Sequence, residues 1–247
     1  MKIKNKLYIL PLLLCLLSGC ELDEKDENID FLLETVFLDN DVRLLDYNAV
    51  KNTEREPFFI EEFNDNNSQF PYQIGEYSDI DVSIVDGKII IEYLEKKNYM
   101  YSRAMPTEID TNKNFEIELK LMVYRDSASQ VLMWLRNSLS NINDYVFGYS
   151  RWLTVGGEER EFIDLYYRRT EDDWKSIRGY ESNSKKFLDS DVFTTLTIRK
   201  IGGKHAIFIN QKLFYIINDK NFRCIPTITM VDRVINVFDY FRVYYLS

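Results

Sequence analysis

The sequence predicts an all-β protein built as an antiparallel sandwich, and three observations support this fold class. Short apolar or alternating segments follow one another from Pro57 to the C-terminus, separated by turn residues, as is typical of sandwiches. The 17 tyrosines and 16 phenylalanines suit pleated sheets, which accommodate aromatic side chains well. No segment after residue 57 has a convincing helical period, and no internal repeat is present.

Two hairpins are predicted from their turn residues. Asp86-Gly87 supplies the positive φ angles of a type I′ turn between the first two strands. Gly202-Gly203 separates a second pair of strands. The four strands cover residues 80–85, 88–94, 193–200 and 205–210.

Further strands are predicted from alternation and from residue type. Residues 115–121 (FEIELKL) alternate strictly, so that one face of the strand is apolar and the other is charged. Three shorter segments are rich in aromatic and β-branched residues, and a long strand run closes the chain. They cover residues 131–135, 144–149, 162–168 and 234–246.

The N-terminus predicts an exported, lipidated protein. Three lysines precede an apolar run from Leu7 to Leu17, and Ser18-Gly19 precedes Cys20. This is the plan of a secretory signal, and it resembles the lipobox of bacterial lipoproteins. The resemblance implies cleavage after residue 19 and a diacylated Cys20, whose acyl chains would hold the protein on a membrane. The apolar run is too short to span a bilayer; an ordinary cleaved signal is the alternative.

The residues after the cysteine are strongly acidic. Residues 21–27 (ELDEKDE) contain five acids and one base. They resemble the acidic export signal with which Bacteroidota send lipoproteins to the cell surface, which implies a surface-exposed outer-membrane lipoprotein. A solvated tether is a simpler interpretation, and both can hold together. The expected organisation is a signal peptide (1–19), a lipidated cysteine with acidic tether and lead-in segment (20–56), and one domain (57–247).

Charge and cysteine content exclude two classes of protein. Removing residues 1–19 removes three lysines and no acids, which leaves 28 basic against 40 acidic residues and a net charge of −12. Such a chain has little attraction for nucleic acid, so nucleic-acid binding is not expected. Beyond Cys20 the mature chain has only Cys224, so there is no disulfide framework.

Short motifs resemble those of concanavalin A-like domains. Three resemble the opening strand, the following hairpin and the closing strand of laminarinase-like family 16 glycoside hydrolases, and a fourth resembles a hairpin of concanavalin A-like domains generally. Laminin-G-like modules and keto-disaccharide hydrolase-like domains of Bacteroidota share this pattern. The resemblance implies a concanavalin A-like jelly roll of two antiparallel sheets. Gln211 departs from it, because the last hairpin normally carries glycine there. The motifs are residues 59–64, 85–91, 238–244, and 196–200 with 207–210.

Catalytic activity depends on carboxylates. Family 16 hydrolases carry Glu-x-Asp-x-x-Glu or Glu-x-Asp-x-Glu on one strand, with one carboxylate as nucleophile and another as acid/base. Glu108-Ile109-Asp110 lacks the third carboxylate, and we interpret it as coincidental. Glu116 and Glu118 share one strand face about 6.5–7 Å apart, which makes them an atypical candidate pair. The solvated face of a convex sheet is the favoured interpretation of these two residues.

Other familiar catalytic motifs are absent from the sequence. The single histidine, His205, stands beside the Gly-Gly turn, and there is no nucleophile elbow, CxxC, HExxH or phosphate-binding glycine loop. We interpret His205 as an ordinary strand residue and Cys224 as a small buried hydrophobe. The sequence therefore favours a protein without catalytic activity.

One metal ligand and one group of sugar-binding residues remain as candidates. Asp239 matches the closing-strand aspartate that, in laminarinase-like proteins, often helps to hold a structural calcium; a bond to neighbouring backbone is the alternative, and no other cofactor is expected. Pyranose rings stack on aromatic side chains, so aromatic and arginine residues of the middle strands are candidates, with core packing as the alternative for each. Trp152 and Trp174 are expected in nearby loops. The candidates are Trp134, Arg136, Tyr145, Tyr149, Tyr166 and Arg168.

Three hypotheses of function follow. The favoured one is a surface-anchored lipoprotein that binds a glycan without catalysis. The second is a glycoside hydrolase of the same fold that uses Glu116 and Glu118. The third is a structural or assembly lipoprotein that binds an outer-membrane protein partner.

Overall fold

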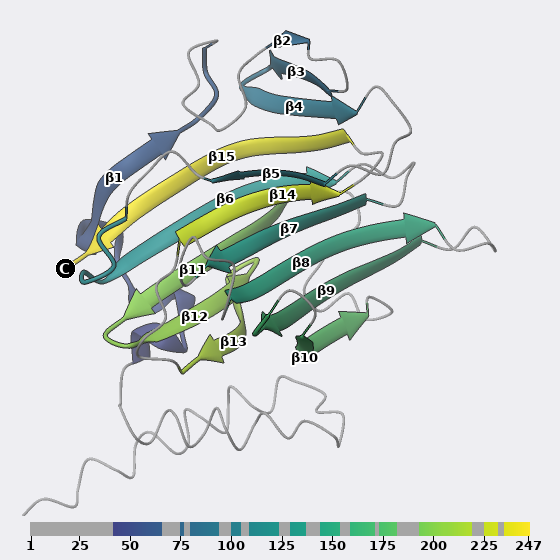
Figure 1. The fold of residues 1–247 in the computed structure, drawn as a ribbon. Coiled ribbons are helices and arrows are strands. Elements are labelled where there is room, and N and C mark those ends of the chain that lie inside the picture. The colour runs from purple at the N-terminus through teal and green to yellow at the C-terminus, as the bar shows by residue number, and fades with distance from the viewer. Residues whose placement is uncertain are drawn as a thin grey trace, which may run out of the picture. The chain divides into compact units, whose positions relative to one another are not determined.

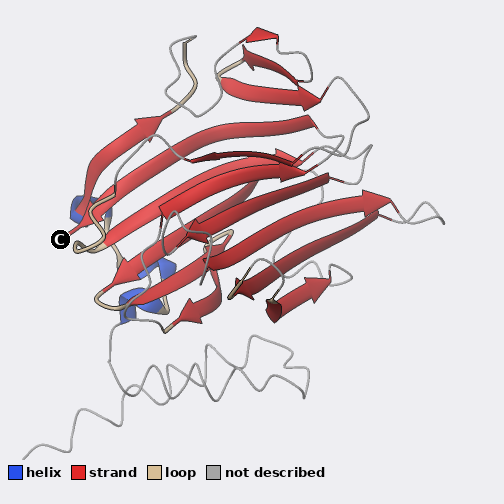
Figure 2. Ribbon diagram, in the orientation of Figure 1, coloured by secondary structure: helices blue, strands red, loops and turns tan. Residues whose placement is uncertain are grey.

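The computed structural model contains two compact units, Met1–Asp41 and Val42–Ser247. The first unit, with the predicted signal peptide, Cys20 and acidic tether, lies outside the described residues. In the second unit the described chain is almost entirely strand (Figure 2). The described residues are 42–65, 75–76, 80–93, 100–104, 109–123, 129–136, 144–153, 159–170, 173–181, 193–218, 225–231 and 235–247.

Nine strands form the larger sheet. Their order is β13-β12-β11-β6-β15-β4-β3-β2, and β1 pairs with β15 beside this path (Figure 1). The strands are β1 (Arg55–Glu61), β2 (Gly75–Glu76), β3 (Ile80–Val85), β4 (Lys88–Tyr93), β6 (Phe115–Val123), β11 (Thr194–Ile201), β12 (Lys204–Ile209), β13 (Lys212–Ile217) and β15 (Ile235–Leu246).

Six strands form the second sheet, in the order β10-β9-β8-β7-β14-β5. Every strand pairing recorded in either sheet is antiparallel. This confirms the predicted fold class of two antiparallel sheets. The strands are β5 (Met100–Ala104), β7 (Ser129–Arg136), β8 (Asp144–Leu153), β9 (Glu159–Arg168), β10 (Trp174–Glu181) and β14 (Ile225–Val231).

Alternate residues of both sheets point inward and form one core. From the larger sheet, β6 contributes every second residue of 115–121, as its alternating sequence predicts. From the smaller sheet, β8 contributes Phe147 and β9 contributes Ile163 and Leu165. Phe147 meets Phe214 of β13 edge to face, with ring centroids 6.1 Å apart. The two sheets are therefore held together by one continuous apolar layer.

The structure confirms the two predicted hairpins, because β3 pairs with β4 and β11 pairs with β12. Asp86 and Gly87 have φ angles of 50° and 69°, as a type I′ turn requires. Asn210 and Gln211, which join β12 to β13, have φ angles of 47° and 67°. Gln211 therefore keeps the left-handed backbone that glycine would adopt more readily.

β15 connects three neighbours in the larger sheet. Residues 235–238 pair with β4, and residues 241–246 pair with β1 along the same edge. The other edge pairs with β6, and the register shifts at Asp239. The predicted closing strand at 234–246 is confirmed, with a β-bulge at its centre.

Residues 42–54 form a segment that we call the strap. It consists of three single-turn 3₁₀-helices, η1 (Val42–Leu44), η2 (Tyr47–Ala49) and η3 (Asn52–Glu54). They lie beside β11 and β12 and near the C-terminus (Figure 1). The strap belongs to the compact unit that begins at Val42, although its sequence carries no strand pattern.

Several elements differ from the sequence pattern. Trp152 lies in β8 and Trp174 begins β10, so the prediction that both lie in loops is wrong. β8 extends four residues past its predicted end, through residues 150–153 (SRWL), whose backbone is still paired with β9. The sequence pattern also does not indicate β5, β10, β13 and β14.

Candidate functional site

Glu116 and Glu118, the carboxylate pair considered for catalysis, are buried on the outer face of β6. Their exposed fractions are 0% and 7%, so the prediction of a solvated face is wrong for both. The strap covers this face. Alternation within β6 shows correctly that the two carboxylates share a face, but it cannot show that residues more than sixty positions upstream fold over them.

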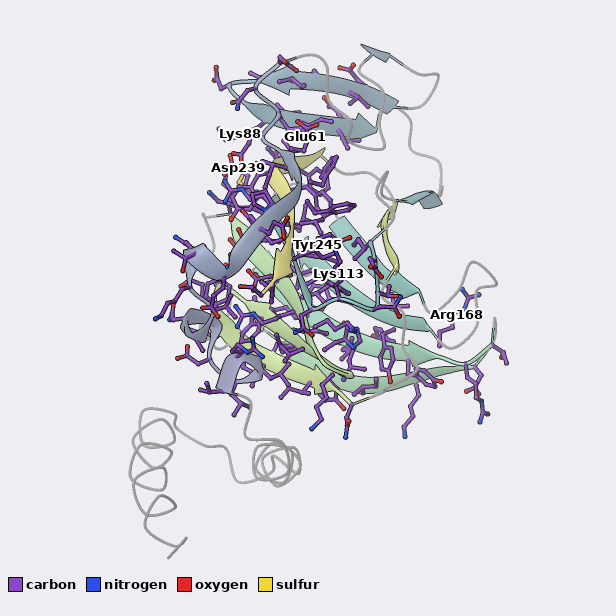
Figure 3. The ribbon with its side chains drawn as sticks, turned by 90° about the vertical axis from the view of Figure 1, so that its left-hand side faces the viewer. Glu61, Lys88, Lys113, Arg168, Asp239 and Tyr245 are labelled. Carbon is purple, nitrogen blue, oxygen red and sulfur yellow. The ribbon has the colours of Figure 1, made fainter. Side chains whose placement is uncertain are left out.

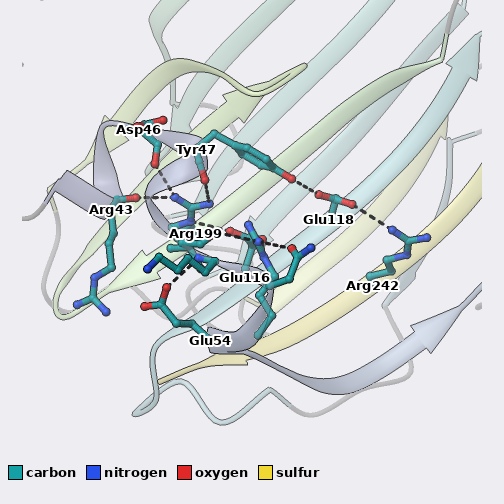
Figure 4. A network of polar contacts seen from close by, with 12 residues as sticks. Arg43, Asp46, Tyr47, Glu54, Glu116, Glu118, Arg199 and Arg242 are labelled. Carbon is teal, nitrogen blue, oxygen red and sulfur yellow. Dashed lines mark hydrogen bonds and ion pairs between the residues drawn. The ribbon is translucent and has the colours of Figure 1, made fainter.

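Glu116 is held between two arginines (Figure 4). Arg199 Nε donates to Oε2 at 2.6 Å, and Arg55 Nε donates to Oε1 at 2.8 Å. Arg199 is itself fully buried. A buried charge is tolerated when it is paired and hydrogen-bonded, and both oxygens of Glu116 meet that condition.

Glu118 is bonded to tyrosines and faces a third arginine. The Tyr47 hydroxyl donates to Oε2 at 2.6 Å, and Arg242 Nη1 lies 3.6 Å from Oε1. Tyr240 also hydrogen-bonds to Glu118. Burial, together with the Glu118 carboxylate, raises the pKa of both tyrosines, so both stay protonated donors at neutral pH. This arrangement gives the carboxylate pair a structural role.

The candidate sugar-binding residues lie on three neighbouring strands, β7, β8 and β9. Residues paired across antiparallel strands share a face of the sheet. Val146 of β8 is the partner of both Trp134 and Tyr166, which places these two residues in one row. Arg136 and Arg168 follow two residues later on the same strands, and so belong to the next row of the same face.

Tyr145 and Tyr149 belong to the opposite face. Tyr145 packs against the core, and its ring centroid lies 5.0 Å from that of Tyr167. Tyr149 is the register partner of Ile163, a core residue. The two tyrosines are out of phase with Val146 by an odd number of residues, so they do not join the other four candidates.

Asp164 joins this face, although the sequence pattern does not single it out. It lies two residues before Tyr166 on β9, and the two side chains hydrogen-bond. Burial raises the pKa of Asp164 against the opposing effect of this bond. Burial and the neighbouring carboxylate also raise the pKa of Tyr166. The signal available in the sequence was the alternation of Asp164 with Phe162 and Tyr166, which places an acid on the same strand face as these aromatic residues.

Both cross-strand neighbours of Asp164 are glycines. Gly148 of β8 is its partner on one side, and Gly179 of β10 is its partner on the other. Neither position carries a Cβ, so backbone and not side chain flanks the carboxyl group within its row. A ligand can approach a strand closely at such positions.

The acids of this face do not form the family 16 motif. A glycosidase needs two carboxyl groups roughly 5–9.5 Å apart. The register places Asp144 two rows from Asp164, about 13 Å along the strand direction. Glu181 of β10 is the diagonal neighbour of Asp164, at about 7–8 Å between Cα atoms. No strand of the six-stranded sheet carries Glu-x-Asp-x-x-Glu or Glu-x-Asp-x-Glu within its described bounds.

Asp239 forms an ion pair. Lys120 Nζ lies 2.6 Å from its carboxylate. Among the described residues, no group of three or more His, Cys, Asp and Glu side chains is placed to hold a metal. The described surroundings of Asp239 therefore fit an ion pair better than a calcium site, which needs several oxygen ligands.

The remaining sequence candidates are placed as follows. His205 is a buried residue of β12, as interpreted, and burial together with Lys200 lowers its pKa to about 3. Cys224 and Glu108 lie outside the described residues. In the described part of the chain, no helix has the length and apolar character needed to cross a membrane.

Comparison of the sequence with known families and curated proteins found no match. No protein-family model matches the chain, and no curated protein matches it in sequence.

Solved structures do match the chain. The laminarinase catalytic domain of Thermotoga petrophila RKU-1 is 12% identical, with a TM-score of 0.53 over 78% of this chain and 98% of that one. The endo-β-1,3-glucanase of Pyrococcus furiosus is 11% identical, with a TM-score of 0.55 over 78% and 95%. The CBM2 module of the evolved Dit of Lactobacillus casei BL23 phage J-1 is 9% identical, with a TM-score of 0.52 over 78% and 96%. These similarities show the fold, which is the expected concanavalin A-like jelly roll.

Proposed function

We propose that this protein binds a glycan, without catalysis, on the outer face of its six-stranded sheet. The observation that carries the proposal is the hydrogen-bonded Asp164–Tyr166 pair, flanked in its row by Gly148 and Gly179. Trp134 belongs to the row of Tyr166. The jelly-roll fold supports the proposal, because its solved neighbours include glucanases and a CBM2 module.

The chemistry of the site suits a sugar. A tyrosine ring offers a face on which the C–H side of a pyranose can stack, and a carboxylate accepts hydrogen bonds from sugar hydroxyls. Tyr166 and Asp164 provide these two groups side by side on one strand. The glycines beside Asp164 place no side chain between the ring and the carboxylate within this row.

The proposal of binding without turnover rests on the carboxylates. Glu116 and Glu118 are bonded to arginine and tyrosine side chains under the strap, and the catalytic motif is absent from the six-stranded sheet within its described bounds. Among the described residues of the six-stranded sheet, Asp164 and its diagonal neighbour Glu181 are the pair that a hydrolase of this fold could use.

We also propose that Cys20 carries the lipid that anchors the protein in the outer membrane, with the domain at the cell surface in the manner of Bacteroidota lipoproteins. The lipobox-like residues and the acidic run after Cys20 support this. Cys20→Ser should move the protein from the membrane fraction to the soluble fraction. Protease added to intact cells should digest the wild-type protein, whereas survival of the anchored protein would place it on the inner side of the membrane.

A glycan array tests the function. The soluble chain from Glu21 to Ser247, which contains the whole compact unit, is screened for binding, and each bound glycan is then analysed for cleavage products. Binding without products supports the proposal, and products would make the protein a hydrolase. A blank array from a folded sample would contradict glycan binding and favour a protein partner, as in the assembly hypothesis.

A further inference from the structure

One buried arginine, Arg199, bonds the strap to the interior of the larger sheet, and Arg55 of β1 also donates to Val50 and Asn52 of the strap. Arg199 of β11 donates from Nη1 to the carbonyl oxygens of Arg43 and Asp46, at 2.7 and 3.0 Å. It donates from Nη2 to the carbonyl oxygen of Tyr47 at 2.8 Å, while its Nε is bonded to Glu116. Figure 4 shows these bonds converging on one guanidinium group. These three hydrogen bonds are all made to backbone carbonyls of the strap.

Tyr47 of the strap contacts the same part of the sheet through its hydroxyl and its ring. Its hydroxyl is bonded to Glu118, and its ring packs edge to face on Phe208, with centroids 5.7 Å apart. The Arg199 guanidinium carbon lies 5.3 Å from the Tyr47 ring centroid and 4.9 Å from that of Phe208. The cation is therefore in contact with an aromatic ring of the strap and an aromatic ring of the sheet.

The strap is also tied to the C-terminal end of the chain. Arg43 Nη1 donates to the Ser247 carbonyl oxygen at 3.4 Å, and the Ser247 amide donates to the Glu54 carbonyl oxygen at 3.1 Å. Leu44 and Val50 of the strap are buried. These contacts join the first described residues to the end of β15, a strand with three partners in the larger sheet.

Removal of the strap alone would be costly. Arg199 would lose three carbonyl acceptors while its partner Glu116 remained within the sheet, and the carbonyls would lose their buried donor. Within the strap, the Asp46 carbonyl also accepts a bond from the Ala49 amide, whereas the carbonyls of Arg43 and Tyr47 are bonded by Arg199. Partial release is therefore less favourable than for an ordinary terminal segment.

We propose that the strap is a latch, which opens only when the nine-stranded sheet itself opens. A pull on the chain before Val42 is then borne by β11 and β6 in the interior of the sheet, and the N-terminal segment cannot peel away first. The strap lies on the opposite side of the sandwich from Arg168 (Figure 3), so it does not lie over the proposed glycan-binding face. The latch requires neither glycan binding nor lipidation of Cys20.

Hydrogen exchange on the full chain in detergent tests the latch. Four strap amides donate backbone hydrogen bonds and can report opening. We expect their protection factors to lie within about tenfold of those in β6 and β11. Exchange more than a thousandfold faster than in these strands would overturn the proposal, because the strap would then open by itself. The amides are those of Leu45, Asp46, Ala49 and Glu54.

A pair of arginine variants identifies the attachment. Arg199→Met should raise exchange at the four strap amides at least a hundredfold relative to the strands. Arg242→Met removes an arginine that also faces Glu118 on this sheet but is bonded to Glu62 and not to the strap, so strap exchange should stay within threefold of wild type. Equal effects of the two variants would contradict the assignment.

A milder variant covers the case in which Arg199→Met does not fold. Tyr47→Phe deletes one hydroxyl that is bonded to Glu118 and keeps the ring. It should raise exchange at the strap amides about tenfold while protection in β6 and β11 falls less. If exchange at the strap amides is unchanged in Tyr47→Phe, or if protection falls equally in strap and strands, this contact has no role in the latch.

Discussion

At the scale of single residues, we expect the buried charge of Arg199 to make a large contribution to the stability of the fold. It is fully buried, paired with Glu116, and bonded to three backbone carbonyls. Arg199→Leu should lower the free energy of unfolding by about 3–5 kcal/mol, because it leaves Glu116 with one arginine and removes the Arg199 donor from the carbonyls of Arg43 and Tyr47. Urea denaturation measures the loss.

The double variant is the control for this prediction. Glu116→Leu combined with Arg199→Leu should cost clearly less than the sum of the two single variants, because the buried Arg199–Glu116 pair is then removed as a unit and only Arg55 loses a partner. If the two losses simply add, the ion pair is not the source of the effect.

Gln211 provides a residue whose backbone conflicts with its side chain. Its φ of 67° lies in the left-handed region, which costs a non-glycine residue about 1–2 kcal/mol. Gln211→Gly should therefore stabilise the fold by about 0.5–1 kcal/mol, after allowing for the greater freedom of glycine in the unfolded chain. Thermal unfolding provides the measurement.

Asn210 is the matched control, because it also has a positive φ, of 47°. Its side-chain oxygen accepts a hydrogen bond from the Thr195 amide at 2.8 Å. Asn210→Gly should therefore destabilise the fold, since it removes that acceptor. Destabilisation by both substitutions would show that backbone strain at Gln211 is not significant.

His205 makes stability depend on pH. Burial lowers its pKa from the ordinary 6.5 to about 3. Between these values the unfolded chain binds a proton that the folded protein does not, so stability falls as the pH drops from 6.5 towards 3. His205→Gln should flatten this part of the pH profile, whatever its effect on stability at pH 7. Chemical denaturation at several pH values measures how the free energy of unfolding changes with pH. An unchanged pH dependence in His205→Gln would show that His205 is not its source.

At the scale of elements, strands with a local sequence signal could be predicted, whereas elements whose position depends on contacts with distant residues could not. The Asp86-Gly87 turn and the alternation of residues 115–121 are properties of a few adjacent residues, and both are confirmed. β13 has the sequence KLFYII, an apolar run without alternation, because residues on both of its faces are buried. The strap carries no strand pattern, and its position depends on Arg199, more than 140 residues away.

The strap leads to a prediction about where the folding unit begins. A chain that starts at Val42 should be as stable as one that starts at Glu21, because the compact unit begins there. A chain that starts at Arg55 loses the buried side chains of Leu44 and Val50, which should cost about 3–6 kcal/mol. Urea denaturation of the three proteins measures this. Equal stability of all three would show that the strap is dispensable.

At the scale of the whole molecule, the sequence predicted more of the fold than of the candidate site. Aromatic and arginine residues on the middle strands were candidates, and the register places Trp134, Tyr166 and the two arginines on one face. Tyr145 and Tyr149 could not be separated from them, because a shift of one residue exchanges the two faces. Asp164 alternates with Phe162 and Tyr166 along its strand, but its glycine neighbours belong to other strands and could not be found from that stretch of sequence.

The glycan-binding face is the central claim, and one comparison tests it most directly. Wild type, Asp164→Asn and Asp239→Asn are applied side by side to the same glycan array, each as the soluble chain from Glu21. Asp239 is the matched control, because it is a partly buried aspartate on the other sheet, paired with Lys120. We predict that wild type and Asp239→Asn bind the same glycans, whereas Asp164→Asn binds them at least tenfold more weakly, because a carboxylate that accepts sugar hydroxyls becomes an amide. Equal binding by folded Asp164→Asn, or no binding by any of the three, would contradict the claim.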